Sequence, residues 1–403
     1  MVLIFPIDDQ RLFEITPTVM DSQPPTQTHG LVSSRYLPTL DGWRAVAIIG
    51  VLVVHGVNLP LAQMGNRGVN IFFGISGFLI CSRLLEEQSR NGRINLPAFY
   101  IRRTFRIFPP YFTYLAVLAV LTAAGIVAVS AREFISCIFF FRNYISTPDP
   151  KPLGLSAGYY TFHFWSLAVE EHFYLIWPSL LIALGVFRAR LAVVLLALGI
   201  GVWRVVEFRF ALLDRVLPDV SFYYRTDVNL DGLFWGCWLA LMLADPQWRE
   251  RFERWLSPGV WLAVLVAYIA LIVREPPLHR ALEALLVPFL LAGTILRPKT
   301  LVGRALEWAP ARWIGRLSYS IYLWQQLFLV KEPASRSPAI RGLQGFPVNL
   351  LAILACAVAS FYLIERPMIR LGHRLSSRLT STARDPRIEE VPAEGNVSMS
   401  AGP

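Results

Sequence analysis

Arg44 and His55 are the first residues along the chain whose types and spacing suggest chemistry. Both fall in the stretch LDGWRAVAIIGVLVVHG, which is mostly apolar. On a helix, eleven residues span about 16 Å and about 1100°, close to three full turns, so the two side chains share one face. A histidine on the same face as an arginine, about 16 Å along the helix, can act as a general base toward a hydroxyl group. The alternative is a packed histidine that is hydrogen-bonded to a neighbouring helix.

Two adjacent carboxylates, Glu170 and Glu171, stand in the segment FHFWSLAVEEHFYLIWP over residues 162–178. They are about 100° apart on a helix, so only one can face a given partner. A buried carboxylate beside an imidazole can fix its tautomer and raise its basicity. The alternative is that these acids cap helix contacts or lie near the outer surface. His163 and His172 match no standard ligand spacing, so no metal site is predicted.

Arg103 and Arg106 form a third candidate site in YIRRTFRIFPPY, residues 100–111. Their i, i+3 spacing makes them neighbours on one helical face. Two guanidinium groups so placed can bind phosphate oxygens through paired hydrogen bonds. The alternative is a topology signal that interacts with anionic lipid.

The composition indicates that a membrane positions these residues. Of the 403 residues, 55% are hydrophobic and 16% charged, and the mean hydropathy is +0.47. The net charge of +10 comes from basic residues spread over short loops, which favours membrane orientation over nucleic-acid binding. Apolar runs of roughly 20 residues predict membrane-spanning helices. They lie near residues 43–61, 68–88, 106–128, 164–187, 190–208, 228–244, 258–274, 281–297, 316–332 and 346–369.

The sequence thus predicts an all-α, polytopic membrane protein, a bundle of about ten transmembrane helices. Most Lys and Arg residues fall in alternate loops, so both chain ends are expected in the cytoplasm (N-in/C-in). Residues 1–36 and 372–403 are expected to be disordered cytoplasmic tails flanking a transmembrane domain over 37–371. The N-terminus does not resemble a signal peptide, and the apolar piece 133–142 is too short to span. We find no Walker A, dinucleotide or zinc-protease motif.

Seven segments between residues 37 and 371 resemble, in order, the acyltransferase 3 family of membrane acyltransferases, which O-acylate cell-envelope glycans and other acceptors. LDGWRAVAI with His55 is similar to the family's opening LDGxRAxAI and its Arg-x10-His element, and FYIRRTFRIFPPY to its Arg-x-x-Arg stretch. The others are GVNIFFGISGFLI, FWSLAVEEHFYLIWP, LDGLFWGCWLA, RLSYSIYLWQQ and FYLIERPMIRLG. Asp231 matches as well. Three positions depart from the pattern: Asn70 replaces Asp, Asn229 replaces Arg and Gln325 replaces His, the last predicting altered acceptor contacts.

The resemblance implies transfer of an acyl group, expected to be acetyl, from cytoplasmic acyl-CoA to a hydroxyl of a glycan or lipid-linked sugar acceptor. His55 would be the base, or alternatively the acyl carrier, and Glu170 or Glu171 would orient it. The resemblance implies no tightly bound cofactor, because acyl-CoA is a co-substrate. The donor-binding residues would be Arg103 and Arg106 at the CoA phosphates, with Arg44 helping to hold the donor or its carbonyl.

The expected location is the cytoplasmic (inner) cell membrane, as a multi-pass protein. Two other functions stay open from the residues alone: a lipid or glycan flippase without acyl transfer, and a non-catalytic scaffold. A flippase needs polar groups at depth but has no need of a phosphate clamp beside a titratable base, so the sequence favours the enzyme.

Overall fold

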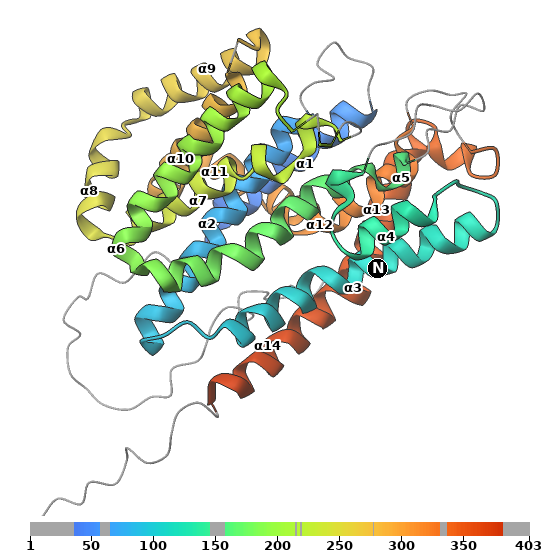
Figure 1. Ribbon diagram of the computed structural model, residues 1–403, viewed down its shortest axis with the longest axis horizontal. Helices are drawn as coiled ribbons and strands as arrows, with labels where there is room; N and C mark the ends of the chain where they lie inside the picture. Colours follow the sequence, from blue (N-terminus) through green and yellow to red (C-terminus); the bar gives the residue numbers. More distant parts are fainter. Residues whose placement is uncertain are drawn as a thin grey trace, which may run out of the picture.

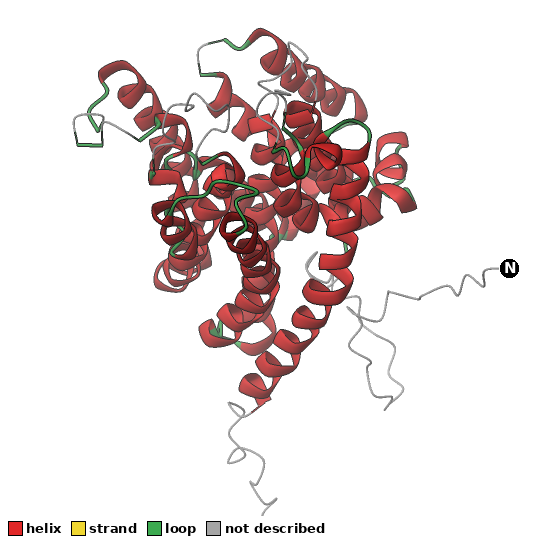
Figure 2. Cartoon of the chain, turned by 90° about the vertical axis from the view of Figure 1, so that its right-hand side faces the viewer, coloured by secondary structure: helices red, strands yellow, loops and turns green. Residues whose placement is uncertain are grey.

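The computed structural model describes residues 36–56, 65–145, 158–213, 216–217, 220–276, 278–330 and 337–381 (Figure 1). All regular structure in these ranges is helical, with no strand among them (Figure 2). The main helices are α1 (Pro38–Gly56), α2 (Gly65–Asn91), α3 (Leu96–Ala123), α4 (Ala131–Ile138), α5 (Tyr159–Phe162), α6 (Phe164–Phe210), α7 (Asp231–Leu243), α8 (Pro246–Trp255), α9 (Pro258–Arg274), α10 (His279–Leu296), α11 (Leu301–Leu306), α12 (Ala309–Phe328), α13 (Val348–Ser360) and α14 (Arg366–Ser381). A π-helical segment, Phe361–Glu365, joins α13 to α14.

Each predicted span overlaps one of these helices, which confirms the all-helical class. By length and composition, five stretches of the described chain qualify as membrane spans, and six if α8 and α9, bent by 80°, form one broken span. The five are Arg67–Asn91, Leu96–Ala123, Tyr159–Phe210, His279–Leu296 and Val348–Leu379. The predicted count of ten and the N-in/C-in orientation are therefore not established by these helices.

The spans predicted over 164–187 and 190–208 belong to one helical element, α6. Gly185 interrupts it with φ 68° and ψ 163°, values outside the helical region. An unbroken helix of 47 residues would be about 70 Å long, more than twice a bilayer core. Arg190, just beyond the break, pairs with Asp245 at the start of α8 at 2.9 Å. The break therefore lies at the end of the bundle where α7 gives way to α8.

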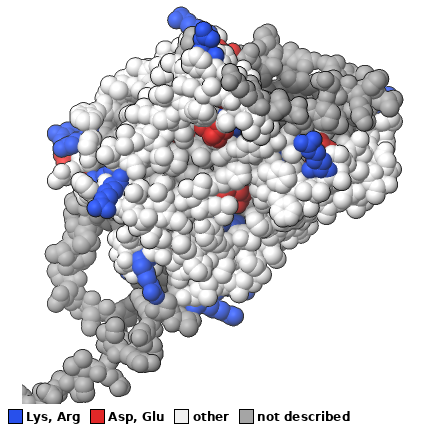
Figure 3. Space-filling model, viewed as in Figure 1, with Lys and Arg blue, Asp and Glu red and all other residues white. Residues whose placement is uncertain are grey.

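Large apolar side chains remain exposed along the outer helices, as expected for contact with lipid. On α6 they include Leu175, Ile182, Leu191, Leu198 and Val202, and on α9 Leu262, Val266, Ile269 and Val273. Figure 3 shows a broad face with few charged side chains, most of the Lys and Arg lying near its outline. Exposed apolar area on this scale is unusual for a soluble monomer. The surface thus supports a multi-pass membrane protein.

Close backbone approach between α2 and α7 forms the centre of the bundle. A Cβ atom at Gly77 would overlap the carbonyl oxygen of Leu233, and one at Gly236 would overlap that of Gly74. The thiol of Cys237 donates to the carbonyl of Gly77 at 3.4 Å. Small residues at such crossings let two helices pack in lipid, where the hydrophobic effect does not drive them together.

Helix α1 packs against α2 on one side and α12 on another. A Cβ atom at Gly315, near the start of α12, would overlap the carbonyl oxygen of Asp41, near the start of α1. Because the two helices begin at the same level and contact each other extensively, they run parallel. This register places equivalent positions of α1 and α12 at the same depth in the bundle.

Two predicted boundaries differ from the structure. The span expected from residue 106 begins at Leu96, because Asn95 caps the helix by accepting from the backbone amide of Ala98 at 3.0 Å. The tail expected from residue 372 is helical to Ser381, and a Cβ at Gly372 would meet the ring of Phe105 on α3. Figure 1 shows α14 lying beside α3. The remaining tail residues, 1–35 and 382–403, lie outside the described ranges.

Candidate active site

Arg44 lies near the start of α1, where it meets charged side chains from other helices. Its guanidinium pairs with Asp41 at 3.4 Å, and Asp41 accepts a 2.6 Å hydrogen bond from the Tyr36 hydroxyl. Arg44 also interacts electrostatically with Arg106 and Arg103 of α3 and with Glu170 of α6. Residues more than 120 positions apart in sequence are therefore brought to one site.

Glu170 is held by two hydroxyl groups from different helices. Ser76 of α2 donates to Oε1 at 3.1 Å, and Tyr174, one turn along α6, donates to Oε2 at 2.6 Å. The i, i+4 spacing of Glu170 and Tyr174 places them on one face of α6. Both carboxylate oxygens of Glu170 are thus fixed by hydrogen bonds. Glu170 is therefore positioned more firmly than its sequence neighbour Glu171, which interacts electrostatically with Glu170 and Arg103.

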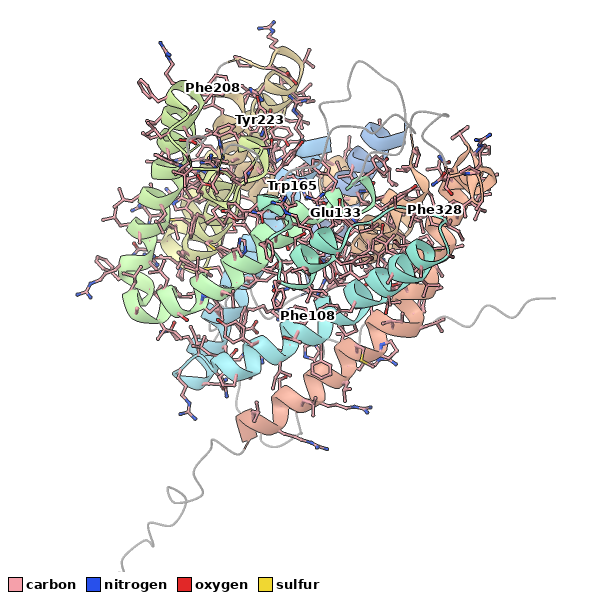
Figure 4. The ribbon with its side chains drawn as sticks, turned by 45° about the vertical axis from the view of Figure 1, so that its right-hand side comes forward. Phe108, Glu133, Trp165, Phe208, Tyr223 and Phe328 are labelled. Atoms are coloured by element: carbon pink, nitrogen blue, oxygen red, sulfur yellow. The ribbon has the colours of Figure 1, made fainter. Side chains whose placement is uncertain are left out.

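Arg103 completes the contact between α3 and α6. Its guanidinium carbon lies 4.8 Å from the centroid of the Tyr174 ring, a cation–π arrangement. Arg103 also interacts electrostatically with Arg106, Glu170 and Glu171. The two arginines are therefore neighbours, as the i, i+3 spacing predicts, and they face carboxylates at the same time. Figure 4 shows how densely side chains from neighbouring helices fill this bundle.

Glu365 joins this site, although it is not among the site residues predicted from the sequence. It is 1% exposed, accepts from the Ser320 hydroxyl at 2.9 Å, and interacts electrostatically with Arg106 and Arg44. It ends the π-helical segment Phe361–Glu365, and such segments are frequent at functional sites. The signal that could have found it is a carboxylate closing a long apolar run in FYLIERPMIRLG. We call Arg44, Arg103, Arg106, Glu170, Glu171 and Glu365 the arginine–glutamate cluster.

His55 lies in α1, but its side chain is outside the described part of the chain. Its backbone is eleven residues beyond Arg44, about 16 Å along the helix. The described partners of Glu170 are at the level of Arg44 rather than of His55. The orientation of His55 by Glu170 or Glu171 therefore stays a prediction.

The other two histidines singled out from the sequence have separate surroundings. The Nδ1 atom of His172 lies 2.7 Å from the Thr226 hydroxyl. His163 packs among aromatic rings, with its ring centroid 5.7 Å from that of Tyr114 and 5.3 Å from that of Tyr322. The structure thus gives them different environments, one beside a loop and one in the aromatic core.

The departures from the family pattern have structural counterparts. Where the pattern has an arginine two residues before Asp231, this chain has Asn229, which donates to the Arg225 carbonyl at 2.7 Å. The arginine partner of Asp231 comes instead from α6, where Arg204 donates to Oδ1 at 2.6 Å. Asn70 donates to Glu283 at 3.5 Å. A different helix therefore supplies the cation that the local motif lacks.

The loop before α7 is held by an ion-pair network. Arg225 pairs with Glu207 at 2.7 Å and with Asp227 at 2.6 Å, and the Trp203 indole also donates to Asp227 at 2.7 Å. Burial raises the pKa of Asp227, but the hydrogen bonds from Arg225 and Trp203 outweigh it, so the pKa is lowered overall. The folded loop therefore stabilises the carboxylate form of Asp227.

Comparisons with known proteins identify the family to which this chain is similar. The model of the family described as an acyltransferase domain matches residues 37–366. The putative peptidoglycan O-acetyltransferase YrhL of Bacillus subtilis is 30% identical over 388 residues, covering 87% of this chain and 57% of that protein. The peptidoglycan O-acetyltransferase OatA of Listeria monocytogenes is 28% identical, covering 84% of this chain and 57% of that protein.

The O-acetyltransferase OatA of Staphylococcus aureus is also 28% identical, over 88% of this chain and 61% of that protein. The chain thus spans roughly three fifths of the length of these curated relatives. No solved structure matches it significantly. Since the family model covers most of the chain, from the start of α1 to the start of α14, the chain belongs to the acyltransferase 3 family of membrane acyltransferases.

Proposed function

We propose that this protein is a membrane-embedded O-acetyltransferase that moves an acetyl group from acyl-CoA to a hydroxyl of a cell-envelope glycan. The observation that carries the proposal is the arginine–glutamate cluster, which gathers three arginines inside a helical bundle of this family. Ionisable groups at membrane depth are costly and are usually kept for function. Relatives named as peptidoglycan O-acetyltransferases support both the reaction and the class of acceptor.

Arg103 and Arg106 are proposed to bind the phosphates of the donor. In the structure Arg103 interacts electrostatically with Glu170 and Glu171, and Arg106 with Glu365. A phosphate would exchange with these carboxylates as the partner of the guanidinium groups, which prefer such planar, paired contacts. The phosphopantetheine arm of CoA, when extended, is comparable in length to the roughly 16 Å between Arg44 and His55 along α1. A donor held at the cluster can thus present its thioester near His55.

In the transfer step, neutral His55 takes the proton from the acceptor hydroxyl. The oxygen attacks the carbonyl carbon of the thioester, a new C–O bond forms, and the C–S bond breaks. The proton on the imidazolium then passes to the departing thiolate, so that free CoA and the acetyl ester leave. A positioned base contributes typically about 10²–10⁴-fold to such a step.

The bundle is proposed to lie in the inner membrane with both ends in the cytoplasm, α6 crossing twice through its break at Gly185. The short α2–α3 connection and its flanks carry Arg90, Arg93 and Arg102, as a cytoplasmic loop should. A cysteine at the exposed Asn91 is expected to react with an impermeant maleimide only from the cytoplasm, and one at Gly342 only from outside. The reverse pattern would remove the argument for a cytoplasmic donor.

The deciding experiment is a transfer assay with purified protein in nanodiscs, radiolabelled acetyl-CoA and a soluble peptidoglycan-derived oligosaccharide. The native protein should release CoA and label the glycan. His55→Ala should bind acetyl-CoA but transfer less than a few per cent as fast. His279→Ala, at the start of α10 where its ring contacts the Pro276 carbonyl, is the matched control and should retain activity. Glycan movement across the bilayer without labelling would instead identify a flippase.

A further inference from the structure

Gln325 of α12 is a buried amide without a partner in the described part of the chain. Its side chain is 0% exposed, and neither Oε1 nor Nε2 has a hydrogen-bond partner. On the same turn, the Trp324 Nε1 and the Gln326 Oε1 are also buried and unpartnered. More than nine in ten buried polar groups in native proteins are paired with protein or water. Successive side chains on a helix point about 100° apart, so each of these three faces a different direction, and Gln325 is the one whose two polar ends are both unpartnered among the described residues.

Helix α12 places this amide close to the level of His55. Gln325 is ten residues beyond Gly315, and Gly315 contacts Asp41 of the parallel helix α1. At the same depth on α1 stands Val51, and His55 follows one turn later, about 6 Å along the axis. Gln325 is also three residues beyond Tyr322, on the same face of α12, and the Tyr322 hydroxyl contacts the His163 carbonyl and the Ser166 hydroxyl. The amide thus lies on α12 at a level beyond the arginine–glutamate cluster.

A second buried glutamine shows what a structural amide looks like in this protein. Gln344 is also 0% exposed, but its Nε2 donates to the Leu327 carbonyl at 2.9 Å and its Oε1 accepts from the Ser337 amide at 2.9 Å. Both ends of that side chain are used inside the chain. Gln325 has the same burial without these bonds, so its retention is not explained by stability.

We propose that Gln325 forms an acceptor subsite, in which its carboxamide binds a hydroxyl of the sugar that receives the acetyl group. The inference rests on the proposed function, of which it specifies the acceptor side. An amide offers both donor and acceptor groups, which complement a hydroxyl that both donates and accepts. An apolar or anionic ligand would leave one end of the amide unpaired. The donor charges remain with the arginine–glutamate cluster, so the two substrates approach His55 from different levels of α1.

The test compares Gln325→Leu with Gln344→Leu in the full-length protein. We measure the KM for the peptidoglycan-derived oligosaccharide, the Kd for acetyl-CoA and the thermal midpoint of unfolding in detergent. Gln325→Leu should raise the acceptor KM about ten-fold or more, leave the donor Kd within two-fold, and keep or raise the midpoint. Gln344→Leu should lower the midpoint and leave the acceptor KM unchanged.

Two outcomes would overturn the subsite. If Gln325→Leu keeps the native acceptor KM, the amide is a core residue that internal water satisfies. If it lowers the midpoint as Gln344→Leu does, the amide has a partner within the protein. Gln325→Met, which matches the shape of the side chain more closely, serves as the second variant should the leucine variant fail to fold.

Binding without transfer separates this inference from the proposed function. The oligosaccharide should raise the midpoint of the native protein but not that of Gln325→Leu. If the native protein shows this Gln325-dependent shift and never transfers acetyl, the subsite stands and the proposed function fails. If acetyl is transferred and the oligosaccharide stabilises both proteins equally, the proposed function stands and the subsite fails. If it stabilises neither and the acceptor KM is also unaffected, the sugar subsite is wrong.

Discussion

Tyr174 touches both signs of charge in the arginine–glutamate cluster: its hydroxyl donates to Glu170 at 2.6 Å, while its ring lies 4.8 Å beneath the guanidinium of Arg103. One side chain of α6 thereby couples the best-held carboxylate to the proposed phosphate-binding arginine. The two contacts use different parts of the residue. Substitution can therefore separate them.

Tyr174→Phe should remove the hydrogen bond and keep the ring under Arg103. A hydrogen bond to a charged group contributes about 1.5–3 kcal/mol, so kcat for acetyl transfer should fall at least ten-fold. The Kd for acetyl-CoA should stay within two-fold. Tyr100→Phe, which loses only an exposed 3.3 Å bond to the Leu175 carbonyl, is the control. An unchanged kcat would show that the position of Glu170 does not matter to the reaction.

Arg103→Ala and Arg106→Ala should each weaken acetyl-CoA binding. Removing one charged hydrogen bond to phosphate should cost about 1.5–3 kcal/mol, an increase in Kd of roughly 10- to 100-fold, measured by calorimetry. Lysine at either position should restore only part of the affinity, because the paired geometry is absent. Arg102→Ala, whose partner is Glu87 at 2.8 Å, is the matched control. Native acetyl-CoA affinity in both alanine variants would indicate that the two arginines act as a topology signal and do not bind the donor.

The Arg204–Asp231 pair should be needed for stability. The two side chains are 12% and 3% exposed, and their 2.6 Å contact links α6 to α7. Arg204→Met or Asp231→Leu alone should lower the free energy of unfolding by about 3–5 kcal/mol, because each leaves a buried charge unpaired. The double variant should lose less than the sum of the two. Strict additivity in thermal unfolding would contradict coupling across this contact.

Gly236→Ala should separate α2 from α7. Its added Cβ would overlap the Gly74 carbonyl oxygen, and such overpacking costs typically about 1–3 kcal/mol. Gly199→Ala is the matched control within α6, since nothing lies within 4 Å of its Cβ position. That substitution should stabilise the helix by up to about 1 kcal/mol. Equal thermal midpoints for the two variants would show that the central crossing tolerates a side chain.

The network around Asp227 should give the loop before α7 an acid-sensitive component of stability. The folded pKa of Asp227 is lower than the 3.8 of a free side chain. Its contribution is therefore fully present above that value and is lost as the pH falls through the lowered folded pKa. The thermal midpoint should decline below about pH 4, and Asp227→Asn should lack this part of the decline. Identical pH profiles for the two proteins would show that Asp227 does not cause the decline in the thermal midpoint.

Much of the architecture follows from local pattern. The apolar runs predict the helices because each can bond its own backbone groups in lipid, and that requirement acts within a segment. The spacing of Arg103 and Arg106 likewise predicts their common face, since three residues are less than one helical turn. Residue type and local spacing also select Arg44, Glu170 and Glu171 as site candidates, and the structure brings all five together.

Contacts between distant segments were decided by the tertiary structure. Glu365 reaches Arg106 because the segment Phe361–Glu365 packs beside α3, and Arg204 replaces the missing arginine at position 229 because α6 packs beside α7. Gln325 and Gln344 are the same residue type in apolar surroundings, yet within the described chain only Gln344 finds partners. Helix pairing sets these differences, because hydrogen bonds and ion pairs form over about 3 Å whereas the sequence separations are tens to hundreds of residues.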